Sequence, residues 1–597
     1  PPDGRPVWWE AWLRDGRLQA FRAVAARLNV ALKPHLVSFP ERDVVLALAD
    51  TATMARLVAN SDAVAELRAP KDTPTFFLDM RPVEQADWAG ELADRTSGPS
   101  ALAPAVCVLD SGATQGHPLI APGLEPEDQH AYEDSWGLGD SAFWNGHGTM
   151  MAGVALYGDV EAALATGEPI ALNHRLETVK ILPPHAQNDP ELYGAVTEVG
   201  IGKAEAQAPR RRRAFVMAVT SEIGLGRGRP SSWSAAIDKL CYGGGNQRRL
   251  IVLAAGNIRD PIVAAEYPDS NDLAEAENPC QAWNALVAGA YTDKITITHP
   301  DHQGWDAVAP AGDLSPASRT SNVWDRQWPI RPDVVFEGGN FAHDGVNPAE
   351  AIDDLQLVTT HYRPNLRLFD SLGDTSAAAA LASHFSAEIM AERPELWPET
   401  VRGLVVHAAE WTPAMRTRFD AAGSQTQKAA LLRRYGWGVP DLARALRSAS
   451  NDATLMIEDA LLPFRREKSV VKTRDMHLHN LPWPRDELLS LGDQDVELRV
   501  TLSYFVEPNP GGRGWTRRHR YASHGLRFAV KRSLESVQHF RQRINRAAEA
   551  EEEGEIGAAA GGDDWVLGTI RDRGSIHSDV WRGSAAALAA RDAIGVF

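Results

Sequence analysis

Four short motifs of this chain contain the side-chain types that nucleophilic catalysis uses: a carboxylate, an imidazole, an amide and a hydroxyl. Each motif stands where an apolar run ends or a helical pattern begins, so a regular element would hold each side chain at its edge. The motifs are Asp110-Ser111-Gly112 after the run Ala105–Leu109, His147 within Asn145–Gly153 at a helix start, Ala254-Ala255-Gly256-Asn257 at a strand end, and Gly373-Asp374-Thr375-Ser376-Ala377 before an alanine-rich helix.

These residue types belong together for chemical reasons. A serine hydroxyl is a poor nucleophile until a neighbouring imidazole takes its proton. A carboxylate bonded to one imidazole nitrogen fixes the tautomer that leaves the other nitrogen free. An asparagine amide beside a backbone N–H can stabilise the oxyanion that forms, and the positive end of a helix favours negative charge at its first turn.

The motifs and their order resemble those of the subtilisin-like serine peptidases, the subtilase or S8 family, in which the chain order is Asp, His, Ser. The segment His147–Gly153 matches the family pattern H-G-T-x-x-A-G without departure. The resemblance implies that Asp110 orients the imidazole, His147 is the general base and acid, Ser376 is the nucleophile and Asn257 is the oxyanion donor. Further matches, from Val179-Lys180-Ile181-Leu182 to Arg434–Asp441, extend the resemblance over about Ala105–Ser448.

One position departs from the family pattern. Asp374 stands where a glycine normally precedes the Thr-Ser pair, and no proline follows Ser376. One interpretation is that the carboxylate reshapes the site and raises the pKa of His147; the other is that Asp374 caps the following helix.

Residues that would contact substrate are predicted from the same resemblance. Ser221, Glu222 and Gly224 follow the apolar run Ala214–Val219, where the family has the wall of its S1 subsite. Glu222 would favour a basic side chain there, or else it points into solvent. Gly224 would leave an extended peptide room to lie alongside.

The chemistry needs no cofactor. Structural calcium is common in the family, but this chain has no Asp/Asn ladder of EF-hand type by which to place such a site. His117 and His384 lack the spacing of metal ligands.

The elements that must position these motifs predict an α/β fold, with a doubly wound, mostly parallel sheet between two smaller domains. We expect a pro-domain-like α+β domain at 1–98, a subtilisin-like catalytic domain at 99–448 and a β-rich, sandwich-like domain at 449–597. Continuous apolar runs that alternate with helical patterns indicate strands buried on both faces of a parallel sheet. Those runs are Ala105–Leu109, Val179–Leu182, Ala214–Val219, Leu250–Ala254 and Ala285–Ala290.

The first block has helical spacing over Trp8–Leu28, a strand at Asp43–Ala49, a helix at Thr51–Asn60 and a strand at Ala63–Arg68. It is similar to the pro-domains of subtilases, which fold with the enzyme and are often removed. That similarity implies a latent zymogen or a retained, non-inhibitory domain, with Ala69–Pro104 reaching toward the cleft.

The composition of the chain limits its possible partners and its cellular location. The 597 residues are 44% hydrophobic and 23% charged, which is globular, and the net charge of −18 argues against nucleic acid as a partner. No apolar run is long enough for a membrane span. Three cysteines and the lack of a visible leader predict a bacterial cytoplasmic protein, provided that no leader was trimmed.

The leading hypothesis is therefore a serine endopeptidase that cleaves protein or peptide substrates. The alternatives are a catalytically silent scaffold with the same fold, and acyl transfer to an amine. Some similar cytoplasmic subtilases are encoded beside an AAA-type ATPase, so such an ATPase is a candidate partner.

Overall fold

An eight-stranded sheet forms the centre of the molecule, with the order β14-β12-β11-β10-β6-β9-β7 and β15 beside β12. The computed structural model describes residues 6–39, 42–68, 74–450, 454–467, 470–473, 476–510, 521–553 and 565–597. All strand pairs of this sheet are parallel except β12 with β14. The strands are β6 (Ala105–Asp110), β7 (Gln129–Ala131), β9 (Arg175–Lys180), β10 (Arg213–Met217), β11 (Leu250–Ala254), β12 (Leu286–Thr292), β14 (Asp313–Leu314) and β15 (Val334–Glu337).

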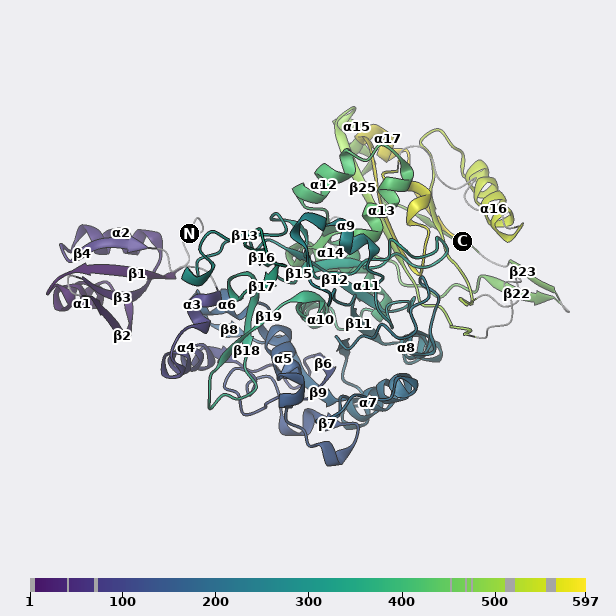
Figure 1. Cartoon of the computed structure of the whole chain (residues 1–597). Helices are drawn as coiled ribbons and strands as arrows, with labels where there is room; N and C mark the ends of the chain where they lie inside the picture. Colours follow the sequence, from purple (N-terminus) through teal and green to yellow (C-terminus); the bar gives the residue numbers. More distant parts are fainter. Residues whose placement is uncertain are drawn as a thin grey trace.

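Helices cover both faces of this sheet (Figure 1), because alternate strand residues point to opposite sides. Val106 and Val108 pack with one set of helices, whereas Cys107 and Leu109 pack with the other. The first set is α5 (His147–Tyr157), α10 (Asp374–Glu392), α11 (Pro398–His407) and α14 (Leu442–Ala449), and the second is α7 (Tyr193–Gln207) and α8 (Ser232–Tyr242). The doubly wound α/β fold predicted from the apolar runs is confirmed.

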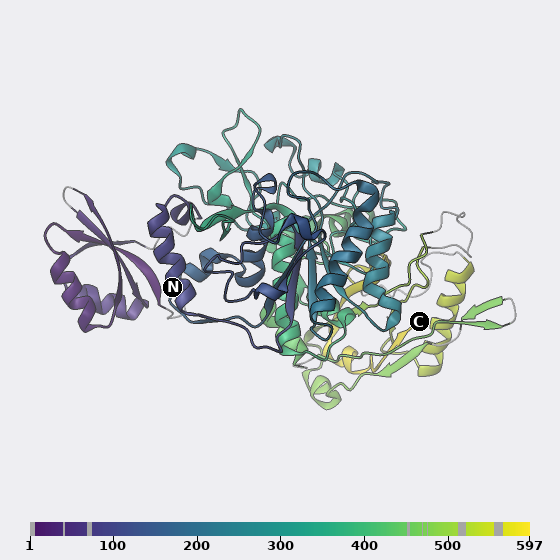
Figure 2. The same cartoon turned by 90° about the horizontal axis from the view of Figure 1, so that it is seen from below.

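A separate antiparallel sheet, with the order β2-β3-β1-β4, forms the N-terminal block. Its elements are β1 (Val7–Arg14), α1 (Leu18–Arg27), β2 (Ala31–Phe39), β3 (Arg42–Ala49), α2 (Thr51–Ala59) and β4 (Val64–Arg68). This sheet lies at one end of the molecule in both views (Figures 1 and 2). Its contacts with the body include a bridge between Val7 and Thr166 and an edge-to-face pair of Trp8 and Trp88.

The helix predicted over Trp8–Leu28 is wrong in its first half, since Val7–Arg14 is the central strand β1 and only Leu18–Arg27 is helical. The sequence there contains one Val and three Trp, which favour strands, and Gly16 then turns the chain with φ 67°. Pairing on both sides, with β3 and β4, outweighs the helical spacing of the apolar residues.

Two helices lie between the N-terminal sheet and the central domain, namely α3 (Pro74–Leu78) and α4 (Pro82–Asp94). They pack on the hairpin of β18 (Leu357–Thr360) and β19 (Phe369–Leu372), which leads directly into α10. Within the segment predicted to reach toward the cleft, α3 and α4 are thus packed on this hairpin, whereas Thr96–Ser97 pairs with β8 (Ile170–Ala171).

In its described residues, the C-terminal block contains small antiparallel sheets and helices. The longest strand pair is β25 (Asp495–Ser503) with β27 (Ile576–Ser584), and a second sheet has the order β24-β28-β26. The other elements are β22 (Phe464–Glu467), β23 (Val470–Thr473), β24 (His477–Asn480), β26 (Phe528–Val530), β28 (Ala593–Val596), α15 (Arg485–Leu491), α16 (Val537–Glu553) and α17 (Ala585–Ala589). The block is β-rich as predicted, whereas its sandwich form and the three domain boundaries stay predictions.

None of the helices in the described part of the chain combines the length and the apolar character that crossing a bilayer requires.

Candidate active site

Asp110 and His147 form one hydrogen-bonded pair at the carboxyl edge of the central sheet. Asp110 is the last residue of β6 and is 1% exposed, while His147 is the first residue of α5. The imidazole Nδ1 lies 2.9 Å from Asp110 Oδ1 and 3.0 Å from Oδ2. A carboxylate only accepts hydrogen bonds, so Nδ1 of the neutral ring carries the proton and Nε2 has the lone pair. His147 is therefore arranged to act as a base through Nε2.

A second carboxylate, Asp140, fixes the start of helix α5. Its Oδ2 accepts hydrogen bonds from the backbone N–H and the hydroxyl of Thr149, each at 2.6 Å. Its Oδ1 accepts from the hydroxyl of Ser111 at 2.7 Å, and Ser111 Oγ in turn accepts from Gly148 N–H. These bonds satisfy two orphan donors of the helix and so set the direction of the imidazole. The sequence has no signal for this role, because Asp140 lies in a loop outside any recognisable motif.

Nearby negative charges favour the protonated form of His147 more than water favours that of an isolated imidazole. Burial lowers its pKa, but attraction to Asp110, and then to Asp140 and Asp374, outweighs burial and raises the pKa. The histidine thus keeps its proton to a higher pH than an isolated imidazole does.

Ser376 lies in the first turn of α10 and is 6% exposed. The neighbouring donors are used: Asp374 N–H donates to Gly338 O, and Thr375 N–H donates to the side chain of Asn257. The backbone N–H of Ser376 has no acceptor within the described residues. No hydrogen bond joins the Ser376 hydroxyl to His147 in the described part of the chain, and such bonds often tighten only when substrate binds.

Asn257 presents its amide NH₂ group beside this serine. Its Oδ1 accepts from Thr375 N–H at 3.1 Å and from the Thr375 hydroxyl at 2.5 Å. Because a backbone N–H can only donate, the amide atom that faces it must be the oxygen, which settles the orientation of the group. Nδ2 has no partner among the described residues, so Asn257, which binds Thr375, and Ser376, which follows Thr375, each have one free donor.

Asp374 adopts the left-handed backbone conformation, with φ 61°. A glycine takes this conformation at no cost, and Asp is among the few other residues that tolerate it. The helix begins at Asp374 with Gly373 as its N-cap and without a side-chain cap. The interpretation of Asp374 as a capping residue is therefore wrong. Burial raises its pKa to about 6, against the opposing attraction of His147 and Arg259.

The three residues predicted to contact substrate follow β10. Ser221 exchanges backbone hydrogen bonds with Asn278, at 2.9 and 3.0 Å, and so is not free to pair with a peptide. Gly224 has φ 86°, which favours glycine. Glu222 does not simply point into solvent, because it forms ion pairs with Arg259 and Arg319. Whether these residues bind substrate stays a prediction.

Sequence reasoning did not find the carboxylate to which these arginines also bind. Glu277 is wholly buried and pairs with Arg259 and with Arg319 Nε, the latter at 3.2 Å. It accepts a further hydrogen bond from the Thr220 hydroxyl. Its partners are distant in sequence and follow no regular spacing, so no sequence signal joins them.

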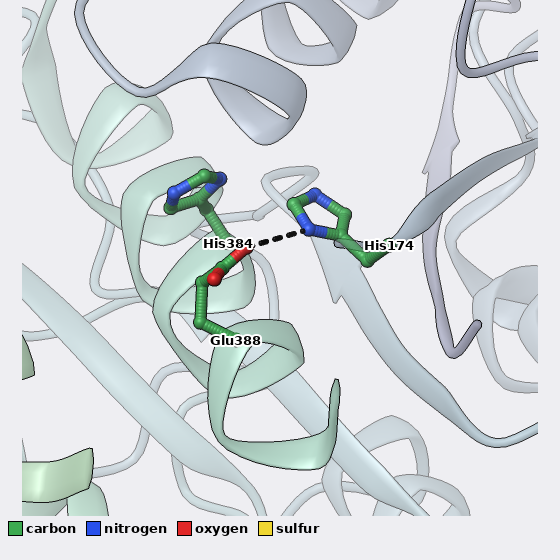
Figure 3. Close-up of side chains that lie close together, drawn as sticks. All are labelled: His174, His384 and Glu388. Atoms are coloured by element: carbon green, nitrogen blue, oxygen red, sulfur yellow. Dashed lines mark hydrogen bonds and ion pairs between the residues drawn. The ribbon is translucent and has the colours of Figure 1, made fainter. Parts of the chain in front are cut away.

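One group of side chains away from this site has the types of metal ligands: His174, His384 and Glu388 (Figure 3). Glu388 Oε1 lies 3.2 Å from His174 Nδ1, and the carbonyl of Ala155 lies near a nitrogen of each histidine, at 2.8 and 3.1 Å. These hydrogen bonds account for the cluster. Two nitrogens and one carboxylate also do not suit calcium, which takes six to eight oxygens, so structural calcium stays a prediction without a site.

The fold and the site define a class: doubly wound α/β proteins with a carboxylate–imidazole pair and a helix-start serine at one edge of the sheet. The sequence profile of the subtilase family, Peptidase S8, matches residues 103–438. This match spans more than half of the chain, so the chain belongs to the subtilase family.

Individual proteins are similar to this chain at lower identity. An uncharacterized protein of Sinorhizobium fredii, y4bN, is 26% identical over 337 residues, which are 53% of this chain and 71% of that protein. The structure of the epidermin leader peptide processing serine protease (EpiP) of Staphylococcus aureus is 14% identical, with a TM-score of 0.38, and the match covers 74% of this chain and 99% of that one. A lanthipeptide protease is also 14% identical, with a TM-score of 0.39, over 63% of this chain and 98% of that one.

Proposed function

We propose that this chain is a serine endopeptidase that hydrolyses peptide bonds of protein or peptide substrates through an acyl-enzyme. Ser376 is the nucleophile, His147 the general base and acid, and Asp110 the residue that orients the imidazole. Asn257 Nδ2 and Ser376 N–H hold the oxyanion.

The steps follow from the positions of the protons. Ser376 Oγ attacks the carbonyl carbon while His147 Nε2 takes the hydroxyl proton, and Asp110 stabilises the imidazolium that results. The carbonyl oxygen becomes negative and is held by the two free donors. The C–N bond breaks as the imidazolium gives its proton to the leaving amine. Water then attacks the ester, His147 takes its proton, and the acid product leaves as Ser376 is reprotonated.

One observation supports this proposal more than the others: the orientation of the Asn257 amide. Thr375, the residue directly before the serine, fixes Oδ1, so the NH₂ group is the part that remains for an oxyanion. A catalytically inactive scaffold protein would gain nothing from two hydrogen-bond donors that are left unpaired near Ser376, at the start of α10.

The test is intact mass after treatment with an alkyl fluorophosphonate, which bonds covalently to activated serines. We expect one adduct on the wild type and none on Ser376→Ala. Ser383→Ala is the matched control, since Ser383 lies on the same helix and its hydroxyl donates to Ala380 O, within that helix. An adduct on Ser376→Ala, or none on the wild type, would contradict the proposal. Digestion of denatured casein then measures hydrolysis.

For the N-terminal block, the better supported of the two predicted forms is a retained, non-inhibitory domain rather than a latent zymogen. Its sheet lies at one end of the molecule and contacts α4 and the chain near Thr166. N-terminal sequencing of the active protein tests this. A new terminus between residues 69 and 104 that appears together with activity would contradict it.

We also propose a cytoplasmic location and an AAA-type ATPase partner. The first is supported by Cys107, Cys241 and Cys280, which are all free and buried. The second is supported by the family resemblance alone. Co-purification from native lysate tests the partner, and recovery of this chain alone would count against it.

A further inference from the structure

Four charged side chains form a closed network behind the Asn257 amide. Two are the carboxylates of Glu222 and Glu277, and two are the guanidiniums of Arg259 and Arg319. Each carboxylate meets both arginines, and a further carboxylate, that of Asp374, is close enough to Arg259 to attract it. Because this network lies next to the proposed oxyanion donors, its charges can affect which substrates bind.

Glu277 ties the network to the oxyanion loop. Its backbone N–H donates to Ala255 O at 3.0 Å, and its side chain lies flat against the α-carbon of Gly256. A Cβ at Gly256 would come within 2.6 Å of Glu277 Cγ, so only glycine fits there. Arg319 holds the same loop from the other side, since its Nε donates to Asn257 O at 2.8 Å.

In the proposed mechanism, this network lies on the acyl side of a bound peptide. In the proposed mechanism the leaving amine takes its proton from His147, so the acyl residue extends from the reacting carbon in the direction away from His147. The carbonyl oxygen of the acyl residue would lie at Asn257 Nδ2. The α-carbon of that residue is bonded to the reacting carbonyl carbon. The proposal therefore places the first acyl-side side chain next to the residues that follow β10 and β11, among them Glu222 and Arg259.

Only two members of the network can respond to a substrate. Glu277 is wholly buried and Arg319 is 10% exposed, so both are held in the interior. Arg259 is 54% exposed and Glu222 is 56% exposed. Arg259 covers the buried carboxylate, with Nη2 at 3.0 Å from Glu277 Oε2 and Nη1 close to Oε1.

We propose that Arg259 determines specificity by excluding basic side chains from the acyl side of the cleaved bond. This inference rests on the proposed function. Arg259 forms ion pairs with the two carboxylates that a substrate arginine or lysine would need to bind. Its own positive charge also repels such a side chain. Without Arg259, two carboxylates would face only Arg319, and the subsite would gain a net negative charge that attracts a cation.

The test uses peptidyl diphenyl phosphonates, which bond covalently to the active serine with loss of phenol. Two probes differ only in the acyl-side side chain, which is a guanidinium in one and isobutyl in the other. Rates of adduct formation are measured by intact mass on the full-length wild type, Arg259→Gln and Arg259→Lys. Arg416→Ala is the matched control, because Arg416 is 57% exposed and pairs with Glu410 far from the site.

We expect the wild type to react about tenfold faster, or more, with the isobutyl probe. Arg259→Gln should raise the rate of the guanidinium probe by roughly 10- to 100-fold and change the isobutyl rate little. Arg259→Lys keeps the charge and should keep the wild-type preference, as should Arg416→Ala.

Two results would overturn the inference: a wild type that prefers the guanidinium probe, or a ratio that Arg259→Gln leaves unchanged. An alkyl fluorophosphonate, which has no acyl-side side chain, separates the two proposals. An adduct with this reagent and an unchanged ratio contradicts only the role of Arg259. The lack of any adduct on all variants contradicts the proposed function, and this inference with it.

Discussion

At the scale of single residues, Asn257 shows how one amide can serve two purposes. Its oxygen is held by Thr375 at 3.1 and 2.5 Å, and the same bonds aim its NH₂ group toward the place where an oxyanion would form. Such a donor stabilises the transition state more than the bound substrate, because the charge on the oxygen appears only during the reaction.

We expect Asn257→Ala to lower kcat by about 10²- to 10³-fold with little change in KM. The measurement is steady-state hydrolysis of a casein-derived fluorogenic peptide. Thr375→Val tests the orienting role and should cause a smaller loss, because the amide remains but is less well held. Equal activity of Asn257→Ala and wild type would remove Asn257 from the mechanism.

Asp374 affects the pH dependence of the same site. A negative neighbour stabilises the imidazolium and raises the pKa of His147, and Asp374 contributes to this effect along with Asp110 and Asp140. The pKa of Asp374 itself is about 6, so it is ionised at neutral pH. Since the neutral imidazole is the base, activity should rise as pH increases through the pKa of His147.

Asp374→Asn should move this acid limb to lower pH by roughly 0.5–1 pH unit, because the imidazole loses a negative neighbour. The rate of fluorophosphonate labelling against pH measures the limb. Asp374→Gly should give the same shift and, by relieving the left-handed conformation, stabilise the fold by about 1 kcal/mol. A limb at the same pH in both variants would contradict the effect of Asp374 on His147.

Residues whose types form local motifs could be predicted from the sequence. Asp110, His147, Asn257 and Ser376 each end a strand or open a helix, and the structure places Asp110 beside His147 and Asn257 beside Thr375 and Ser376. Glu277 could not be predicted, because it binds Arg259 and Arg319 only after three loops come together in the fold.

At the scale of elements, the hairpin β18–β19 joins the two helices that carry His147 and Ser376. The hydroxyls of Thr359 and Thr360 donate to carbonyls in the first turns of α5, at 2.6 and 2.7 Å. The other end of the hairpin runs directly into α10. Any element that holds this hairpin therefore helps to hold both halves of the site.

Helices α3 and α4 do so through Gln85, which is 1% exposed. Its amide oxygen accepts from Leu368 N–H at 2.9 Å, and its NH₂ group donates to Phe77 O at 3.0 Å. Phe77 and Trp88 add apolar contacts with Phe369 and its neighbours. From this packing we expect α3 and α4 to be stabilised by the central domain, although they precede the predicted boundary at residue 98.

Two truncations should therefore differ sharply. Removal of residues 1–73 keeps α3 and α4 and should leave the fluorophosphonate adduct intact. Removal of residues 1–97 exposes the hairpin and should give a protein that does not fold, as measured by circular dichroism and by loss of the adduct. Equal labelling of both truncated forms would show that α3 and α4 do not support the site.

The element that sequence analysis mispredicted shows the limit of periodicity. Apolar residues over Trp8–Leu28 fit a helix, yet their first half is the central strand of the N-terminal sheet. A strand in the middle of a sheet gains hydrogen bonds from both neighbours, and its partners here lie up to 58 residues away in the chain, as in the pair of Glu10 and Arg68. Local spacing contains no information about such partners.

At the scale of the whole molecule, one buried arginine joins the C-terminal block to the central domain. Arg402 of α11 is not exposed at all. It donates to the carbonyls of Trp283 and Asn284 at 3.0 and 2.9 Å, and to those of Tyr504 and Ser575, each at 2.8 Å. The three segments that meet here are far apart in the chain, so their contact belongs to the assembled molecule and not to any one element.

Replacement of Arg402 by Met keeps much of the volume but removes the donor of the Asn284 and Tyr504 carbonyls, whereas the Trp283 and Ser575 carbonyls keep the Ser575 hydroxyl and the Tyr504 N–H. Each unsatisfied carbonyl costs free energy, so we expect Arg402→Met to lower the free energy of unfolding by roughly 3–5 kcal/mol. Urea unfolding measures this, with Arg416→Met, 57% exposed in the wild type, as a control that should change by less than about 0.5 kcal/mol. If both variants unfolded at the wild-type urea concentration, the C-terminal block would be an appended domain. A loss confined to Arg402→Met would mean that the catalytic sheet and the C-terminal sheets share one core, and that truncation near residue 450 cannot yield a stable peptidase.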